Sequence, residues 1–148
     1  MADGGKSQQD LSPKDLNSKD LSPKDLPARH LPYPVAIDAY GSGGFRFANL
    51  SHRGSLLCLP DGIWAWPVNS VAELTEAALA PVFERAQSLD LFLIGAGRDP
   101  YALPERLRAR FRALSISVDC LGTGPAAQTY NILLGEKRRV AAGLIAVD

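Results

Sequence analysis

Two glycine-bearing loops are the stretches of this sequence whose residue types could bind a ligand. Gly95-Ala96-Gly97 follows an apolar run that ends at Ile94, and Gly122-Thr123-Gly124-Pro125 follows a second apolar run. Glycine loops after strands hold phosphates in many nucleotide-binding proteins, because the main chain can approach the ligand closely. The first loop is not a dinucleotide fingerprint, since Pro100 stands where a third glycine is required, and it is not a Walker loop. Taken alone, it is more typical of a structural turn.

The two loops become a candidate binding site if the strands before them are parallel neighbours. Parallel strands bring their carboxyl ends to one edge of a sheet, where open α/β sheets bind ligands. Main-chain N–H groups of Ala126 and Ala127, at the start of a helix, would favour an anion there. We therefore predict a crevice that holds a small acidic ligand. The residues predicted to line it are Gly95, Gly97, Arg98, Asp99, Thr123, Gly124 and Gln128.

The other residues capable of chemistry lack suitable neighbours. His30 and His52 are not framed by a pair of carboxylates, so we expect both at the surface. Cys58 and Cys120 match no metal-binding or redox spacing. No serine has a base placed to activate it. We therefore predict no catalytic residue, no metal site and no cofactor.

A protein-binding surface is the alternative use of the domain. Trp64 and Trp66 lie two apart in an expected strand and so share a face. Tryptophan at such a position is either a core residue or an interface anchor. Arg106 and Arg110 belong to an arginine-rich helix, and with the two tryptophans they form the predicted interaction surface. Nucleic acid is not the expected partner, because no aromatic side chains are interleaved with these arginines for stacking.

Residues 1–32 differ in composition from the rest of the chain. A five-residue repeat of the DLSPK type runs from Asp10 to Leu26, with one leucine and a Lys–Asp pair in each unit. Such a segment buries too little apolar area to offset the entropy of ordering it. We predict a disordered tail over residues 1–32 and a single α/β domain over residues 33–148.

The bulk properties exclude several classes of protein. The formal net charge is zero, so no overall field attracts nucleic acid or an anionic membrane. No apolar run approaches the roughly 20 residues that span a bilayer, and we expect no secretory signal. Two widely separated cysteines favour a reducing compartment. These properties predict a cytoplasmic protein without a membrane span, and they leave the oligomeric state open.

The order of the expected elements indicates the fold class. An antiparallel β meander comes first, and helices then alternate with strands. Expected strands lie near residues 45–47, 55–59, 63–68, 90–94, 116–121 and 140–147. Expected helices cover about 80–88, 104–114 and 125–137, and Ser70 with Glu73 fits a capping box whereas Thr75 with Ala78 does not. We predict an α/β fold with a central mixed β-sheet, flanking helices and a small N-terminal antiparallel β meander, in which the first crossover is parallel and right-handed.

Five stretches together resemble a known domain family. They are Tyr40-Gly41 with Gly43-Gly44-Phe45, Arg53–Leu57, Leu93–Gly95 with Gly97, Thr129–Leu134 and Arg138–Ile145. The family has long been described as of unknown function, and it includes the mitochondrial assembly factor 3 of respiratory complex I and a human adipogenesis-associated protein. The resemblance covers roughly residues 33–147. It implies a three-layer β/α fold with a mixed central sheet and no established enzyme activity.

The resemblance also implies a role. The mitochondrial member helps to build complex I at a membrane through protein contacts, so we expect a non-enzymatic interaction or assembly factor. Its partners would be subunits of a membrane respiratory complex or of an insertion machinery. The alternative is a binding protein or enzyme that takes a small anion between the loops Gly95–Gly97 and Gly122–Gly124. Many relatives have Asp-Thr and Cys-Arg where this sequence has Gly122-Thr123 and Ala127-Gln128, so no chemistry is carried over.

Overall fold

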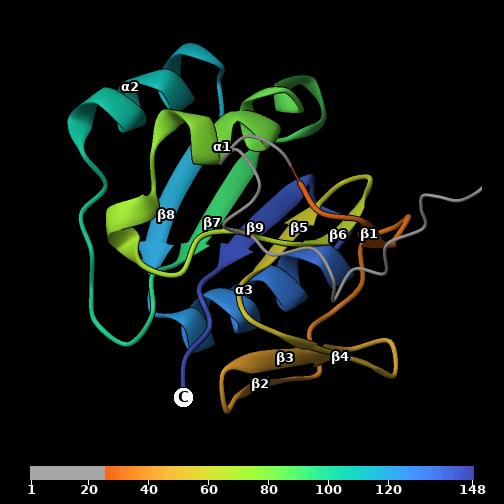
Figure 1. The fold of residues 1–148 in the computed structure, drawn as a ribbon. Helices are drawn as coiled ribbons and strands as arrows, with labels where there is room; N and C mark the ends of the chain where they lie inside the picture. Colours follow the sequence, from red (N-terminus) through yellow and green to blue (C-terminus); the bar gives the residue numbers. More distant parts are fainter. Residues whose placement is uncertain (1–25) are drawn as a thin grey trace, which may run out of the picture.

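Two sheets of different size organise the chain (Figure 1). The computed structural model describes residues 26–148. The strands are β1 (Arg29–Leu31), β2 (Ala39–Gly41), β3 (Gly44–Phe47), β4 (Leu50–Arg53), β5 (Leu56–Leu59), β6 (Gly62–Ala65), β7 (Leu91–Gly95), β8 (Ser117–Leu121) and β9 (Val140–Leu144). The helices are α1 (Glu76–Phe83), α2 (Glu105–Ala113) and α3 (Thr123–Gly135), with 3₁₀ turns η3 (Val71–Glu73) and η4 (Ala86–Ser88) on either side of α1.

The larger sheet is mixed and contains the parallel crossover that the sequence predicts. Its six strands lie in the order β1-β6-β5-β9-β7-β8. β7 is parallel to both β9 and β8, with Leu91 opposite Ser117 and Gly95 opposite Leu121. β5 joins β9 and β6 in antiparallel pairs. The loops that follow β7 and β8 therefore leave the sheet at the same edge.

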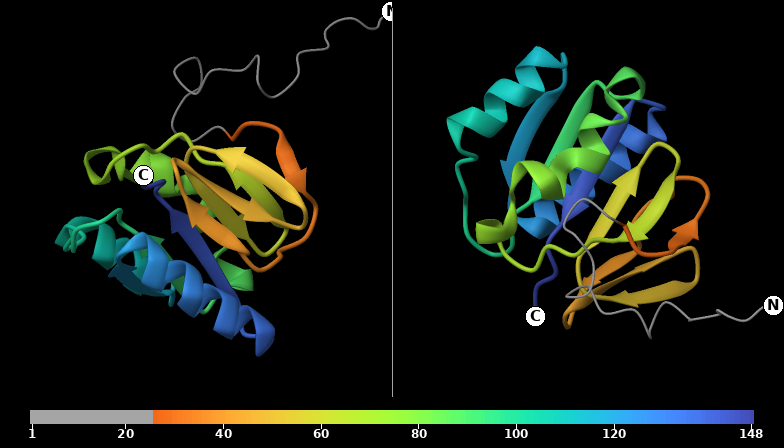
Figure 2. Two further views of the ribbon diagram at one scale, coloured as in Figure 1. Left: turned by 90° about the horizontal axis from the view of Figure 1, so that it is seen from below. Right: turned by 45° about the horizontal axis from the view of Figure 1, so that its top comes forward.

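Side chains of the central strands alternate between two hydrophobic cores. In β5, Leu57 and Leu59 point to the core shared with α1 and α2, whereas Leu56 and Cys58 point to the core shared with α3 and the small sheet. Figure 2 shows α1 and α2 on one side of the large sheet and α3 on the other. The predicted α/β fold, with three layers, a central mixed sheet and a small antiparallel β layer, is confirmed.

The small sheet consists of β2, β3 and β4, all antiparallel. Its second hairpin turns at Ala48 and Asn49, both of which have positive φ (49° and 64°). Two successive residues of this kind form the tight turn whose twist matches that of paired strands. Alanine is rare in such a turn, so the sequence did not predict β4.

The domain begins before the boundary predicted at residue 33. Arg29–Leu31 forms β1 and pairs antiparallel with β6, and Leu26 packs against the core next to α1 and α2. β1 is joined to the sheet by its main chain, and its side chains are only partly buried. Because β1 needs few apolar side chains, its composition is as polar as that of the repeat before it, and composition alone did not reveal the strand. The rest of the predicted tail, residues 1–25, lies outside the described residues.

The first helix also differs from the prediction. α1 spans Glu76–Phe83 rather than residues 80–88, and Pro81 lies inside it. The hydroxyl of Thr75 accepts a hydrogen bond from Ala78 N at 3.1 Å and caps the helix, whereas Ser70 makes no such bond. Pro81 removes one helical hydrogen bond. The burial of Leu79, Val82 and neighbouring apolar side chains outweighs that loss.

The two tryptophans share a face, as predicted, but that face is core. Trp66 is 3% exposed and Trp64 is 8% exposed. Trp66 lies directly over Gly143 of β9, where a Cβ atom would come within 2.5 Å of the indole ring. Neither tryptophan is available as a surface anchor, so this part of the predicted interaction surface is wrong. The two-residue spacing of the tryptophans predicts that they share a face, but it does not show whether that face is buried or exposed.

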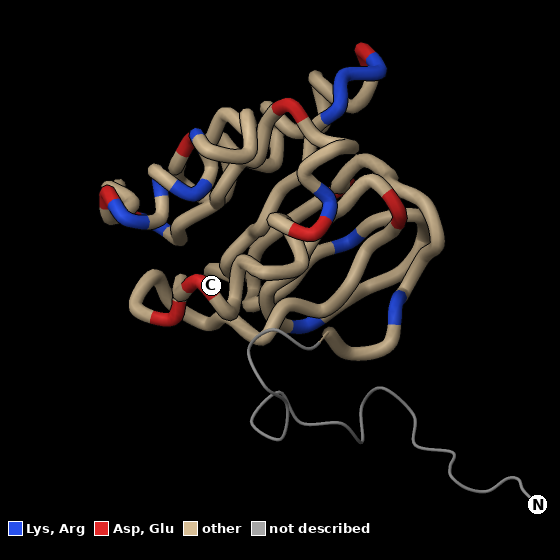
Figure 3. Tube along the Cα trace, turned by 90° about the horizontal axis from the view of Figure 1, so that it is seen from above, with Lys and Arg blue, Asp and Glu red and all other residues tan. Residues whose placement is uncertain are grey.

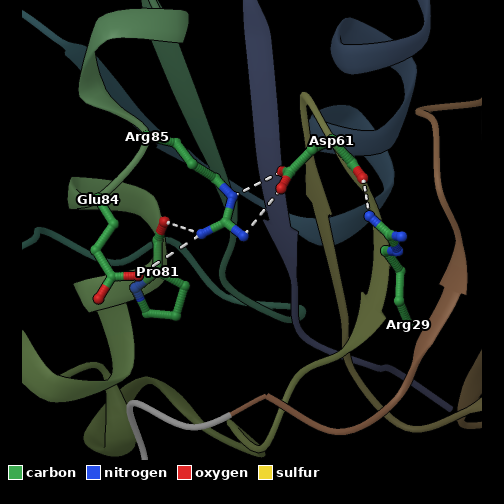
Figure 4. A network of polar contacts seen from close by, with 5 residues as sticks. All are labelled: Arg29, Asp61, Pro81, Glu84 and Arg85. Atoms are coloured by element: carbon green, nitrogen blue, oxygen red, sulfur yellow. Dashed lines mark hydrogen bonds and ion pairs between the residues drawn. The ribbon is translucent and has the colours of Figure 1, made fainter.

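Arg29, Asp61 and Arg85 form a polar network (Figure 4), and both arginines lie near Trp64. The Asp61 carboxylate accepts hydrogen bonds from Arg85 Nε and Nη2, at 2.7 and 3.1 Å, and the Asp61 main-chain oxygen accepts one from Arg29 Nη1 at 3.0 Å. The guanidinium carbons of Arg85 and Arg29 lie 5.1 and 5.7 Å from the centroid of the indole ring. Hydrogen bonds from Arg85 lower the pKa of the Asp61 carboxyl. The network connects β1, the β5–β6 turn and the end of α1.

One side chain of α3 holds the segment that leads into the small sheet. Asn131 Oδ1 accepts from Ile37 N, and Asn131 Nδ2 donates to Ile37 O, both at 2.8 Å. Ile37 is 5% exposed, so its main-chain groups need partners that water does not readily supply. Asn131 therefore replaces the strand neighbour that Ile37 lacks, and it fixes the small sheet beside α3.

We predict that Asn131→Ala lowers the free energy of unfolding by about 2 kcal/mol, because two hydrogen bonds of about 1 kcal/mol each are lost. Urea denaturation of purified protein measures this. Gln128→Ala is the matched control, since Gln128 is exposed on the same helix, and it should change stability by less than about 0.5 kcal/mol. Equal effects of the two substitutions would contradict the assigned role of Asn131.

Candidate functional site

The two glycine loops meet at one edge of the large sheet, and a hollow of about 590 Å³ opens between them. Gly97, Arg98, Thr123 and Gly124 line it, as do Tyr40 of β2 and Asp148. The remaining predicted ligand-binding residues lie elsewhere. Gly95 is buried beneath the loop, where a Cβ atom would come within 3.0 Å of Thr123 Cα. Asp99 and Gln128 are exposed and do not line the hollow.

Thr123 connects the loops rather than presenting its hydroxyl to a ligand. Its Oγ1 accepts from Gly97 N at 3.0 Å and donates to Ile145 O at 2.7 Å, and its main-chain N donates to Gly97 O at 2.9 Å. The side chain is 1% exposed. Thr123 thus joins the ends of β7 and β9 to the start of α3, and its polar atoms are already paired.

The start of α3 offers fewer free donors than the sequence suggested. Ala126 N, predicted to be free, donates to Gly122 O at 2.9 Å because the helix already begins at Thr123. Pro125 has no N–H. Within residues 26–148, this leaves Gly124 N as the unbonded donor of the first turn. Tyr40 lies against this position, since a Cβ atom on Gly124 would come within 2.2 Å of the tyrosine hydroxyl.

The charges around the hollow partly cancel. Arg98 is exposed, and its Nη2 donates to the main-chain oxygen of Asp148 at 2.9 Å. Asp148 also lines the hollow, so a carboxylate faces any acidic ligand that Arg98 would attract. Sequence reasoning did not place Tyr40 or Asp148 at this site. Both come from parts of the chain far from the glycine loops, and no local spacing connects them.

Neither cysteine is an activated nucleophile. Cys58 is fully buried against Tyr130 of α3, and burial raises the pKa of its thiol to about 12. Cys120 lines the hollow, and partial burial raises its pKa as well. A nucleophilic cysteine requires the opposite shift, because the thiolate is the reactive form. Within residues 26–148, no group of three or more His, Cys, Asp or Glu side chains is placed to hold a metal ion.

The two histidines form a hydrogen-bonded pair instead of lying separately at the surface. His52 Nε2 is 3.0 Å from the carbonyl of Ser55, and His52 Nδ1 is 3.1 Å from His30 Nε2. A carbonyl only accepts, so we assign the hydrogen of His52 to Nε2, which makes His30 the donor to Nδ1. Burial lowers the pKa of both rings, and the neighbouring His30 lowers that of His52 further. The prediction of separate surface histidines was wrong, because β1 was not foreseen.

Most arginines of α2 are paired rather than free for a partner. Arg110 Nε lies 3.0 Å from Glu76 Oε2, and its guanidinium stands 4.8 Å from the centroid of Phe83. Arg108 and Arg112 both pair with Glu105. Of the two arginines predicted as interaction residues, Arg110 is thus bound to α1, whereas Arg106 has no ion pair within the described residues. Figure 3 shows Lys and Arg next to Asp and Glu in several segments of the trace.

Comparison with known proteins identifies the family. The model described as "Protein of unknown function (DUF498/DUF598)" matches residues 37–145. The chain belongs to this family. The predicted resemblance is therefore confirmed, and the DUF498/DUF598 match covers both sheets except β1.

Members of the DUF498/DUF598 family and solved structures show how far the similarity extends. An uncharacterized protein of Rhodobacter capsulatus is 38% identical over 111 residues, which are 75% of this chain and 84% of that protein. NADH dehydrogenase [ubiquinone] 1 alpha subcomplex assembly factor 3 of Drosophila melanogaster is 31% identical over 114 residues, which are 75% of this chain and 58% of that protein. A crystal structure of an outer membrane protein from Bartonella henselae has a TM-score of 0.77 and 44% identity, and the match covers 80% of this chain and 100% of that one. Among residues 26–148, no helix has both the length and the apolar character needed to cross a membrane.

We predict that acid weakens the fold through the histidine pair. Both pKa values are lowered from the ordinary 6.5, so the unfolded chain binds more protons than the folded chain as the pH falls. The free energy of unfolding should therefore fall as the pH drops through 6.5 towards the lower, folded-state values. Urea denaturation at pH 7.5 and at pH 5.5 measures this fall. The double variant His30→Gln/His52→Gln should lose less of its free energy of unfolding between these pH values. If the variant shows the same pH dependence as the wild type, the histidine pair is not the cause.

A pair of glycine substitutions tests the contact of Tyr40 with α3. Gly135→Ala places its methyl group in open space at the end of α3, and it should raise the free energy of unfolding by about 0.5 kcal/mol. Gly124→Ala should bring no such gain, because its methyl group displaces the Tyr40 ring, and the NMR signals of that ring should shift. Equal gains from both substitutions, with an unmoved ring, would rule out the contact.

Proposed function

We propose that this protein is a non-enzymatic interaction protein that assists the assembly of a membrane respiratory complex. The observation that carries the proposal is the similarity to complex I assembly factor 3, at 31% identity over 114 residues. That similarity extends over three quarters of this chain, so it concerns the domain as a whole rather than one motif.

The geometry of the crevice supports a role without turnover. The polar atoms of Thr123 and Gly97 bond to one another and to Ile145, so they hold the loops in place. Cys120, the thiol at the hollow, has a raised pKa. The hollow therefore resembles a structural junction more than a catalytic centre, which needs a nucleophile beside a base.

The proposed partners are protein subunits of a respiratory complex or of the machinery that inserts them into a membrane. The proposed place of action is the cytoplasm, and the two free cysteines fit a reducing compartment. Such subunits would contact surface side chains that have no ion-pair or hydrogen-bond partner within the domain.

A second candidate function is the binding of a small acidic ligand in the crevice. The hollow of about 590 Å³, which Arg98 and Gly124 line, favours this candidate. Titration with phosphate, sulfate and acetate, followed by NMR, tests it. Shifts in both glycine loops that disappear in Arg98→Ala would support an anion site, and unmoved loop resonances would eliminate it.

Affinity purification from the protein's own host tests the proposed function. The tagged full chain is crosslinked mildly, membranes are solubilised, and the recovered proteins are identified by mass spectrometry. We predict recovery of respiratory-complex or membrane-insertion subunits. The variant Arg98→Ala is the control for the crevice and should recover the same subunits at the same level. Recovery of the bait alone would contradict the proposal, and loss of the subunits in Arg98→Ala would move the partner contact to the crevice.

A further inference from the structure

The small sheet has one buried face and one open face. Phe45 and Phe47 of β3 are buried in the core that also contains α3. Arg46, between them in the strand, is exposed and therefore points the opposite way. A hollow of about 490 Å³ lies against this sheet, and Arg46, Ser51 and Arg53 are among the residues that line it. We call the open side of β2, β3 and β4, with Arg46, Ser51 and Arg53, the outer face.

Two arginines lie on the outer face. Arg46 and Arg53 form no ion pair within residues 26–148, whereas five arginines elsewhere in the domain pair with carboxylates. Those five are Arg85, Arg108, Arg110, Arg112 and Arg139. Arg46 lies opposite Ser51, two residues from Arg53 on the same face. Diagonal neighbours of this kind are ~7–8 Å apart, so two like charges lie close together on this face.

The turn between β2 and β3 lies next to this face and is built from small residues. Gly41, Ser42 and Gly43 all have positive φ, at 127°, 52° and 80°. Gly44 accommodates no side chain, because a Cβ atom would come within 2.2 Å of His52 O. Arg46 and Arg53 are both exposed beside this turn, so a ligand can reach the two guanidinium groups.

We propose that the outer face docks an extended acidic segment of the partner protein, with one carboxylate on Arg46 and another on Arg53. Acidic residues two apart in an extended chain are about 6.6 Å apart, which matches the diagonal spacing of the two arginines. Guanidinium and carboxylate groups form paired, charge-assisted hydrogen bonds. This inference rests on the proposed function, because it states where the protein partner binds and what chemistry it presents.

A carboxylate segment fits this face better than nucleic acid does. The outer face carries two arginines, and of the aromatic rings that line its hollow, Phe45 is buried and Tyr40 is 48% exposed. Binding of single-stranded nucleic acid uses stacked aromatic side chains along a longer basic groove. The net charge of the chain is also zero. An acidic peptide is therefore the expected ligand, and an oligonucleotide is the competitor to test.

The test is an NMR titration of the ¹⁵N-labelled full chain with a short peptide of alternating Thr and Glu. The amide chemical-shift changes should be largest in residues 39–53. The double variant Arg46→Gln/Arg53→Gln should weaken binding about tenfold. The variant Lys137→Gln/Arg138→Gln removes two exposed positive charges elsewhere and should leave binding unchanged. A Thr–Lys peptide should not bind.

Three outcomes would overturn the inference. They are the absence of shifts with the Thr–Glu peptide, equal weakening by both double variants, and tighter binding of an oligothymidine than of the peptide. Urea denaturation of Arg46→Gln/Arg53→Gln should match the wild type, which separates lost binding from lost folding.

The same variant separates this inference from the proposed function. In crosslinked purification, Arg46→Gln/Arg53→Gln should lose the respiratory or insertion subunits that the wild type recovers, while Lys137→Gln/Arg138→Gln should keep them. Equal recovery by both variants would reject the outer face and leave the assembly role intact. Recovery of the bait alone with the wild-type chain would reject the assembly role itself, and the peptide titration would then decide the chemistry of the outer face.

Discussion

The side-chain amide of Asn131 fixes the position of the small sheet, and both surfaces of interest depend on that position. Its two hydrogen bonds to Ile37 hold the chain beside α3 just before β2 begins. Gly43 N adds a second attachment by donating to Val147 O at 2.8 Å. Tyr40 is thereby brought over the start of α3. The same attachment buries Phe45 and Phe47 and leaves Arg46 on the outside.

The crevice between the glycine loops and the hollow on the outer face differ in how many of their polar groups already have a partner within the domain. In the crevice, Thr123 bonds to Gly97 and Ile145, and Arg98 bonds to Asp148. On the outer face, the guanidinium groups have no carboxylate partner within residues 26–148. Charges that a fold leaves uncompensated contribute to recognition, because a partner can neutralise them without breaking an existing pair. The account therefore places partner binding on the outer face.

Apolar runs and glycine or proline turns in the sequence predicted the strands and helices that depend mainly on local sequence. The apolar run before Gly95 predicted β7, and Gly122-Thr123-Gly124-Pro125 predicted a helix here that begins two residues earlier than expected. The meeting of the glycine loops followed from parallel pairing. The burial of Trp64 and the pairing of His30 with His52 could not be foreseen, since both depend on β1, whose sequence is polar. Tyr40 reaches the crevice only through tertiary packing, so no spacing in the sequence indicates it.

Site-specific photo-crosslinking in the host tests the central claim most directly. A photoreactive amino acid is placed at Ser51 on the outer face or at Ala113 at the end of α2, two exposed positions on different elements. The account predicts that a respiratory-complex or membrane-insertion subunit is crosslinked from Ser51 and not from Ala113. Crosslinking of that subunit from Ala113 alone would contradict it, because the partner would then contact the side of the large sheet that carries α2.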